Sequence, residues 1–176
     1  YLERLARDHG PKTALLFKGA RVSYAQLEAE STACAGALWQ VGVRPGDRVA
    51  LLLPNCPQFF VAEFAAWKTG AIVVAVNPTY SEREIESVLD STRSETVIVL
   101  TPFYERVKRV QGRSGVKRVI ATSIKEYLPP ALRVLFTLYK EKKEGHRITL
   151  AAGDLWFQDL LRTHRGASRP ADAVRP

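Results

Sequence analysis

The chain has 176 residues, 46% of them hydrophobic and 25% charged, which excludes disorder along its whole length and allows one domain with a sizeable core. Its formal net charge is +8, and residues 102–147 carry all of this excess, which excludes a uniformly basic surface. No run approaches the roughly 20 apolar residues that a membrane-spanning helix needs.

The start of the chain is charged and polar, so we expect no secretory leader and a cytoplasmic location. The two cysteines, Cys34 and Cys56, form no CxxC pair and have no histidine at metal-ligand spacing. We therefore expect two reduced thiols and no metal site. The sequence contains no methionine, so we expect it to be part of a longer protein. The three histidines lie in polar stretches and are expected at the surface: His9, His146 and His164.

The first quarter of the chain predicts two helices with a hairpin between them. The expected elements are a short helix over 2–8, hairpin strands over 13–18 and 21–23, and a longer helix over 24–41. Ser23 is placed to cap the longer helix, with Gln26 completing a capping box. Gly42 is placed to end it.

Strands and helices then alternate along the chain with short links. The expected strands are 48–53, 72–76, 96–100 and 117–121, and the helices between them are 57–69, a helix capped by Ser81 with Glu84, and 103–111. This alternation predicts an α/β fold, with an open, mostly parallel sheet and helices on both of its faces.

One helix of this region carries an aromatic stripe. Phe60, Phe64 and Trp67 recur at helical spacing, and we expect them in the core.

In open parallel sheets ligands bind beyond the carboxyl ends of the strands. Those ends are expected at residues 54–55, 77–80 and 101–102. Asn77, Pro78 and Tyr80 follow the second strand and are therefore candidates for contact with a substrate. A turn that only begins the next helix also explains these residues, and it is the interpretation that we favour.

Residues 124–147 interrupt the alternation with a basic amphipathic helical insertion. Pro129 and Pro130 suit the start of its helix. Its candidate contact residues are an apolar set and the lysines that follow it: Leu132, Leu135, Phe136, Tyr139, Lys140, Lys142 and Lys143. This helix is expected either to lie on an anionic membrane or to pack on its own domain or on a second subunit, as in a homodimer. Residues 148–176 are expected to form a short segment and a polar linker.

The motifs of several catalytic classes are missing from the sequence. It has no GxGxxG, no GxxxxGK[ST] and no GxSxG, and no carboxylate pair stands out. We therefore assign no catalytic residue. No glycine-rich turn follows a strand, which disfavours a nucleotide-binding dehydrogenase. Basic residues without an interleaved aromatic platform indicate a solvated face over 106–118, and no nucleic-acid partner is expected.

Three stretches occur in one order and register over about 55 residues. They are Val-Ser-Tyr-x-x-Leu at 22–27, Gly-Asp-Arg-Val-Ala with Leu-Pro-Asn at 46–55, and Trp-Lys-Thr-Gly-Ala through Asn-Pro at 67–78. Together they resemble the early motifs of the adenylate-forming (AMP-binding) acyl-CoA synthetases. The resemblance spans residues 1–123, which it implies to be an N-terminal subdomain. Ala75 and Val76 depart from the Pro-Leu that commonly precedes Asn-Pro in that family.

The insertion indicates which members of that family the sequence resembles most. Glu-Tyr-Leu-Pro at 126–129, followed by an apolar and basic helix, is similar to bacterial long-chain fatty acid–CoA ligases, and so is Trp-Phe-Gln-Asp-Leu-Leu at 156–161. The resemblance implies a fatty acid substrate, adenylation with ATP and Mg²⁺, and thioester formation with CoA in the full-length enzyme.

The family's Ser/Thr/Gly-rich phosphate loop is absent from the 176 residues, so none of its catalytic residues carries over. We expect this chain to be inactive alone and to bind none of the three cofactors. The alternative is a non-catalytic α/β interaction module that contacts an anionic membrane or partner through residues 102–147.

Overall fold

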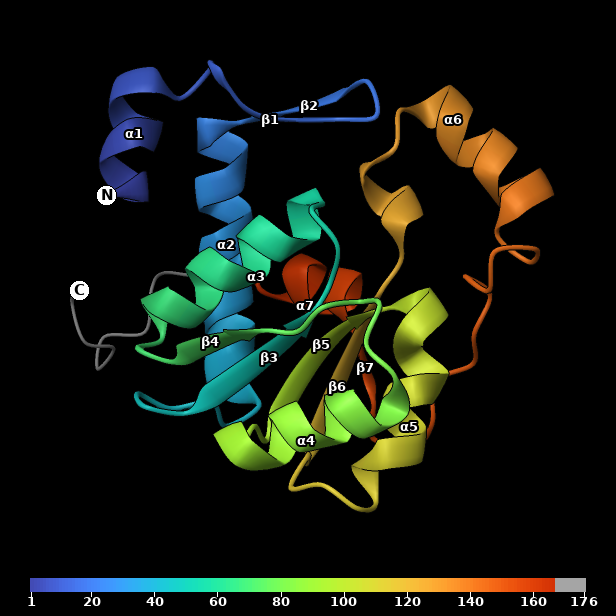
Figure 1. The fold of residues 1–176 in the computed structure, drawn as a ribbon. Helices are drawn as coiled ribbons and strands as arrows, with labels where there is room; N and C mark the ends of the chain where they lie inside the picture. The colour runs from blue at the N-terminus through green and yellow to red at the C-terminus, as the bar shows by residue number, and fades with distance from the viewer. Residues whose placement is uncertain (167–176) are drawn as a thin grey trace.

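The structure is a computed structural model that describes residues 1–166 and holds two sheets (Figure 1). The strands are β1 (Thr13–Phe17), β2 (Ala20–Ser23), β3 (Arg48–Leu52), β4 (Ile72–Ala75), β5 (Thr96–Leu100), β6 (Arg118–Thr122) and β7 (Leu155–Trp156). The helices are α1 (Leu2–His9), α2 (Tyr24–Gln40), α3 (Pro57–Lys68), α4 (Glu82–Thr92), α5 (Tyr104–Gln111), α6 (Pro130–Leu135) and α7 (Phe157–Thr163). Two 3₁₀ turns, η1 (Thr101–Phe103) and η2 (Ile124–Tyr127), and one π-helical turn, η3 (Phe136–Lys140), complete the set.

The main sheet has five parallel strands in the order β4-β3-β5-β6-β7. The mostly parallel α/β sheet is therefore confirmed, and β3 to β6 each lie within one residue of the predicted range. The small hairpin is also confirmed, as the antiparallel pair β1-β2.

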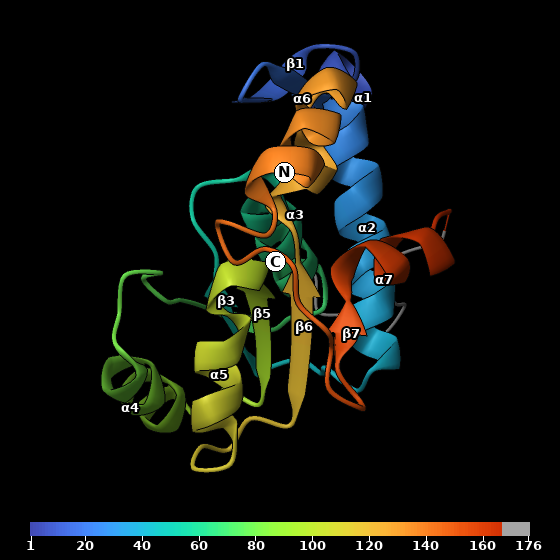
Figure 2. The same cartoon turned by 90° about the vertical axis from the view of Figure 1, so that its right-hand side faces the viewer.

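Helices cover both faces of the main sheet, because successive side chains of each strand point to opposite sides (Figure 2). In β3, Val49 and Leu51 join the core under α2 and α3. Ala50 and Leu52 join the core under α4 and α5. Each β3 residue named here is at most 1% exposed, which is why residues 49–52 are an unbroken apolar run in the sequence.

The two predicted capping boxes have different outcomes. At the start of α4, Glu84 N–H donates to Ser81 Oγ, and Ser81 N–H donates to Glu84 Oε2 at 2.8 Å, which confirms the box. At the start of α2, Ser23 Oγ accepts the Gln26 N–H at 3.1 Å, so the cap is confirmed. The Gln26 side chain donates to Glu30 Oε1 at 2.8 Å instead of accepting the backbone N–H of Ser23. The second hydrogen bond of this predicted capping box is therefore wrong.

The aromatic stripe of α3 does not form the centre of the core. Trp67 is 44% exposed, while Phe60 and Phe64 are half-buried. The fully buried face of α3 is built from small residues instead: Val61, Ala62, Ala65 and Ala66. Their size lets α3 pack closely on α2, so the prediction of a buried Trp67 is wrong.

A strand and a helix that were not predicted follow the insertion. Leu155 and Trp156 of β7 pair in parallel with Ile120 and Ala121 of β6. Phe157, at the start of α7, is 0% exposed and joins the core under α2 and α3. Residues 148–163 therefore extend the sheet and its core, where a short segment and linker were expected. The linker predicted for the end of the chain extends over residues 167–176, which lie outside the described residues.

The insertion leaves the sheet after β6 and rises beside the tip of the β1-β2 hairpin (Figures 1 and 2). It runs through η2, α6 and the π-helical turn η3, and then returns along residues 146–154 to β7. None of the helices within residues 1–166 is both long and apolar enough to cross a membrane.

Candidate functional site

The carboxyl ends of the parallel strands form one edge of the sheet, as the topology predicts. Leu100 ends β5 and Thr122 ends β6, and the insertion begins directly after the second of these, at Ile124. The insertion therefore lies over the edge at which ligands of open α/β sheets bind.

The candidate loop at 77–80 is a compact turn. Asn77 Oδ1 accepts from the backbone N–H of Thr79 at 3.0 Å and from its hydroxyl at 2.9 Å. The Arg106 guanidinium donates to the carbonyls of Pro78 at 3.2 Å and Tyr80 at 2.9 Å. These bonds hold the loop to α5 and explain its shape without a ligand. The substrate role of Asn77, Pro78 and Tyr80 stays a prediction.

A cavity of about 590 Å³ opens between the insertion, the hairpin tip and the carboxyl edge. Most of its lining is apolar. The lining residues are Lys18, Leu100, Ile124, Leu128, Leu132, Leu135, Phe136, Tyr139, Lys140, Glu144 and His146. Such a volume, with a mainly apolar wall and few polar groups, is typical of small-molecule sites.

The lining of this cavity comes from several segments. Leu100 at the end of β5 and Ile124 at the start of η2 are at most 9% exposed. Phe136 reaches the cavity from η3 and is 8% exposed. Two cations, Lys18 from the hairpin tip and Lys140 from the end of η3, also line it. The Glu144 carboxylate also lines the cavity, 3.4 Å from Lys140. The arrangement suits a mainly apolar molecule that carries a negative charge.

His146 ties the returning chain to the edge of the sheet, and its expected place at the surface is wrong. It is only 7% exposed. Its Nδ1 lies 2.8 Å from Thr101 Oγ1, and its ring meets the Phe136 ring edge-on, with centroids 4.9 Å apart. Burial lowers the pKa of His146, against the opposing effect of the carboxylates of Glu144 and Glu141.

Two further polar contacts hold the base of the insertion. Lys125 forms an ion pair with Glu141, which is 7% exposed. The Tyr127 hydroxyl donates to Glu30 of α2. Burial, followed by the nearby Glu30 charge, raises the pKa of Tyr127, so this hydroxyl stays protonated as a donor. The ion pair thus joins the two ends of the insertion to each other, and the Tyr127 hydrogen bond joins the insertion to α2.

The apolar residues predicted for the insertion helix divide into two groups. Phe136 turns inward, as described above. Leu132, Leu135 and Tyr139 line the cavity, yet they are 44%, 51% and 72% exposed. The basic residues Lys140, Lys142 and Lys143 are exposed at the end of the helix.

A second, polar cavity of about 380 Å³ lies on the other side of His146. Its lining mixes cations and carboxylates, among them Lys125, Arg147 and Asp159. Ser123 Oγ is buried there and has no hydrogen-bond partner in the described part of the chain, while Gln58 donates to the Ser123 carbonyl at 2.8 Å. The near balance of charge gives this cavity no clear preference for an anion.

The basic segment at 106–118 is largely neutralised by acidic neighbours. Its ion pairs are Arg109–Glu82 at 2.6 Å, Arg113–Glu86 at 3.1 Å, Lys117–Glu95 at 2.7 Å and Lys108–Asp154 at 2.8 Å. This pairing agrees with the solvated face expected from the sequence.

Lys68, the lysine of the third motif, lies inside the fold. It is 8% exposed, forms an ion pair with Glu28 of α2 and donates to Thr32 Oγ1 at 2.6 Å. Its place in the motif is therefore explained by the packing of α3 on α2. The next motif residues end the helix: Gly70 has φ +76°, and a Cβ there would lie 3.1 Å from the Pro45 side chain.

The cavity itself was not predicted from the sequence. Its residues come from the hairpin, the end of β5, η2, the insertion helix and the returning chain, and no periodic pattern connects them. Two signals in the sequence pointed to this place, namely the carboxyl end of the strand at 96–100 and the insertion itself.

The sequence profile of the AMP-binding enzymes matches residues 2–153. The long-chain-fatty-acid–CoA ligase of Bacillus subtilis (strain 168) is 33% identical over 132 residues, which cover 75% of this chain and 24% of that protein. The crotonobetaine/carnitine–CoA ligase of Salmonella arizonae is 34% identical over 122 residues, or 65% of this chain and 24% of that protein.

Solved structures share the fold. An anthranilate CoA ligase in complex with anthranoyl-AMP superposes with a TM-score of 0.78 over 99% of this chain and 29% of that chain, at 23% identity. The chain thus spans about a quarter of the length of the curated relatives it matches.

Proposed function

The chain belongs to the AMP-binding enzyme family, and on that premise we propose that it is the N-terminal part of a long-chain fatty acid–CoA ligase. The full protein would join a fatty acid to AMP and then transfer the acyl group to CoA. The observation that carries the choice of acyl group is the apolar cavity with lysines in its lining at the carboxyl edge of the sheet. The curated relatives of the chain include ligases of quite different acyl groups, so the choice of a fatty acid depends on this cavity.

The chemistry of the cavity favours a long acyl chain. Each methylene removed from water contributes about 0.8 kcal/mol of favourable free energy, so a longer acyl chain binds an apolar wall more tightly. Leu128, Leu132 and Leu135 supply that wall. The carboxylate would lie near Lys18, because Lys140 is already paired with Glu144 at 3.4 Å.

The nucleotide is not assigned to these residues. The sequence has no glycine-rich loop with a lysine that could hold a triphosphate. ATP, Mg²⁺ and CoA are therefore proposed as requirements of the full protein. For the 176-residue chain we predict no ATP–pyrophosphate exchange with hexadecanoate, and measurable exchange would contradict this part of the proposal.

The test is a fluorescence titration with cis-parinaric acid, followed by competition with hexadecanoate and octanoate. We expect binding, with hexadecanoate competing far better than octanoate. Leu132→Trp, which fills the cavity, should weaken binding at least about tenfold, the effect of losing about 1.4 kcal/mol. Val134→Trp is the matched control, because Val134 lies on the same helix but does not line the cavity.

Equal effects of the two tryptophan variants would place the fatty acid elsewhere. Absence of binding to the parent chain, with its fold intact by circular dichroism, would overturn the assignment of the cavity.

A further inference from the structure

We propose that the outward face of the insertion helix binds the surface of an anionic lipid bilayer. This face is Val134, Leu135, Leu138 and Tyr139, followed by the lysine cluster Lys140, Lys142 and Lys143. The inference goes beyond the proposed function, because it assigns a surface where that function assigns a cavity.

The first observation is that this helix leaves most of its apolar side chains uncovered. Val134, Leu138 and Tyr139 are 59%, 69% and 72% exposed. Phe136 alone of the large apolar residues between 131 and 140 turns into the core. Several exposed apolar side chains in one turn and a half of helix mark a contact surface.

The second observation is charge. Residues 129–147 hold five basic and two acidic residues, a net charge of +3. One of the two acids, Glu141, is 7% exposed and pairs inward with Lys125. The other, Glu144, lies 3.4 Å from Lys140 at a solvent-exposed site. The exposed end of the insertion is therefore positive, which favours an anionic partner.

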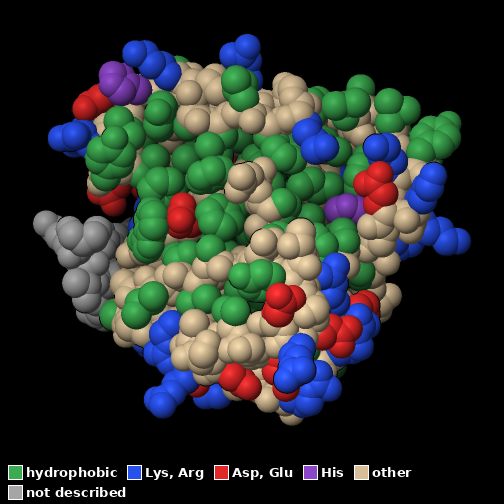
Figure 3. Space-filling model, viewed as in Figure 1, with side chains coloured by type: hydrophobic (Ala, Val, Ile, Leu, Met, Phe, Trp, Pro, Cys, Tyr) green, Lys and Arg blue, Asp and Glu red, His purple; other side chains and the backbone are tan. Residues whose placement is uncertain are grey.

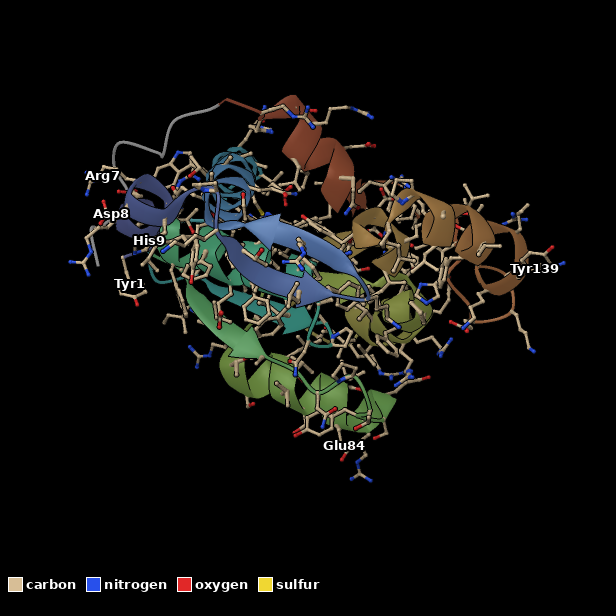
Figure 4. All side chains as sticks on the ribbon, turned by 90° about the horizontal axis from the view of Figure 1, so that it is seen from above. Tyr1, Arg7, Asp8, His9, Glu84 and Tyr139 are labelled. Atoms are coloured by element: carbon tan, nitrogen blue, oxygen red, sulfur yellow. The ribbon has the colours of Figure 1, made fainter. Side chains whose placement is uncertain are left out.

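The third observation is shape. The insertion projects at one end of the molecule, with Tyr139 at the side opposite Tyr1 (Figure 4). Apolar and cationic side chains meet over this part of the surface, whereas the surface over α4 is mainly charged (Figure 3). A short helix with apolar side chains beside lysines suits the boundary between lipid headgroups and acyl chains.

Leu135, Tyr139 and Lys140 belong to both this surface and the cavity, but the other residues of the surface are separate from the cavity. Val134 and Leu138 are exposed and do not line the cavity, while Leu132 and Phe136 do. Variants of Val134 and Leu138 should therefore leave the affinity for the fatty acid unchanged. A failure of the membrane proposal can thus be told apart from a failure of the proposed function.

The test is co-sedimentation of the chain with vesicles of phosphatidylcholine alone, or mixed with phosphatidylglycerol. We expect binding to the mixed vesicles at low salt, weaker binding at physiological salt, and little binding to phosphatidylcholine alone. The apolar variant is Val134→Ser with Leu138→Ser, expected to weaken binding at least about tenfold by loss of buried apolar surface. Its control is Tyr1→Ser with Ile72→Ser, at residues that are 83% and 53% exposed elsewhere on the molecule.

The charge variant is Lys142→Gln with Lys143→Gln, because Lys140 also lines the cavity. Each lysine near an anionic surface contributes about fivefold, so binding should fall about 25-fold. Arg113→Gln with Lys117→Gln is the control, because it removes the same charge from the segment that follows α5.

Three outcomes would overturn the proposal. One is absence of binding to mixed vesicles at low salt by the folded chain. Another is an equal loss of vesicle binding in the lysine-cluster variant and in its control, which would mean that the attraction comes from the net charge and not from this surface. The third is concentration-dependent dimerisation in sedimentation velocity that Val134→Ser with Leu138→Ser abolishes while vesicle binding persists, because a second copy would then cover this face.

Discussion

The ion pair between Lys68 and Glu28 gives the sharpest prediction about what holds the fold together. The Lys68 side chain is 9% exposed and that of Glu28 is 19% exposed, so both charges have lost most of their water. Among residues 1–166, the buried Glu28 Oε2 has no hydrogen-bond partner, and Glu28 Oε1 also accepts from Thr32 Oγ1 at 2.9 Å. Removing the lysine would leave a largely buried carboxylate with Thr32 as a weak substitute.

Loss of one partner from a buried pair typically costs about 3–5 kcal/mol. We expect Lys68→Met to cost about 3 kcal/mol, near the lower limit, because Glu28 keeps some access to water. Lys68→Met combined with Glu28→Gln removes both charges, and a hydrophobic replacement of a buried pair is often nearly neutral. The double variant should therefore be more stable than Lys68→Met alone, by about 1–2 kcal/mol.

The assay is urea unfolding followed by far-UV circular dichroism, with the free energy taken at constant slope. Glu28→Gln completes the double-mutant cycle. Strict additivity of the two single changes, or a cost below about 1 kcal/mol for Lys68→Met, would refute the view that this motif lysine stabilises the packing of α3 on α2.

Three smaller predictions concern single contacts. Ser81→Ala removes the cap of α4 and should cost about 1 kcal/mol in thermal unfolding, whereas Ser91→Ala on the exposed face of the same helix should cost far less. Tyr104→Phe removes a hydroxyl that contacts Asp154 and accepts the Ala151 N–H at 2.8 Å. It should cost about 1–3 kcal/mol and speed amide exchange over residues 148–154, and unchanged exchange there would contradict the role given to the hydroxyl. Because burial lowers the pKa of His146, the unfolded chain binds this proton more readily, so its contribution to stability should be complete above about pH 6.5 and fall as the pH drops below that value. His146→Gln should flatten this dependence in urea titrations, while the charged neighbours Glu141, Glu144 and Lys125 remain in both proteins.

Much of the fold could be predicted because its central strands are buried on both faces. A short run such as 49–52 is apolar throughout and lies between turn residues, which is typical of a central parallel strand. The capping box at Ser81 is equally local, since its two partners lie three residues apart. These features depend on neighbours in sequence and so are visible in it.

The missed features depend on neighbours in space. The strand β7 is two residues long, which is too short for a period, and it is held by pairing with β6. His146 lies in a polar stretch, yet the fold places it against Thr101 and Phe136. Trp67 has the spacing of a core residue, but the alanines beside it take the contact with α2. No local pattern distinguishes these outcomes.

Photo-crosslinking with a diazirine-bearing hexadecanoic acid tests the central claim most directly, because it reports where the acyl chain lies. The chain is irradiated with the probe, digested, and the labelled peptides are identified by mass spectrometry. The account predicts label on residues 124–139 that excess hexadecanoate prevents. Label confined to other segments, or label on 124–139 that hexadecanoate does not reduce, would contradict it.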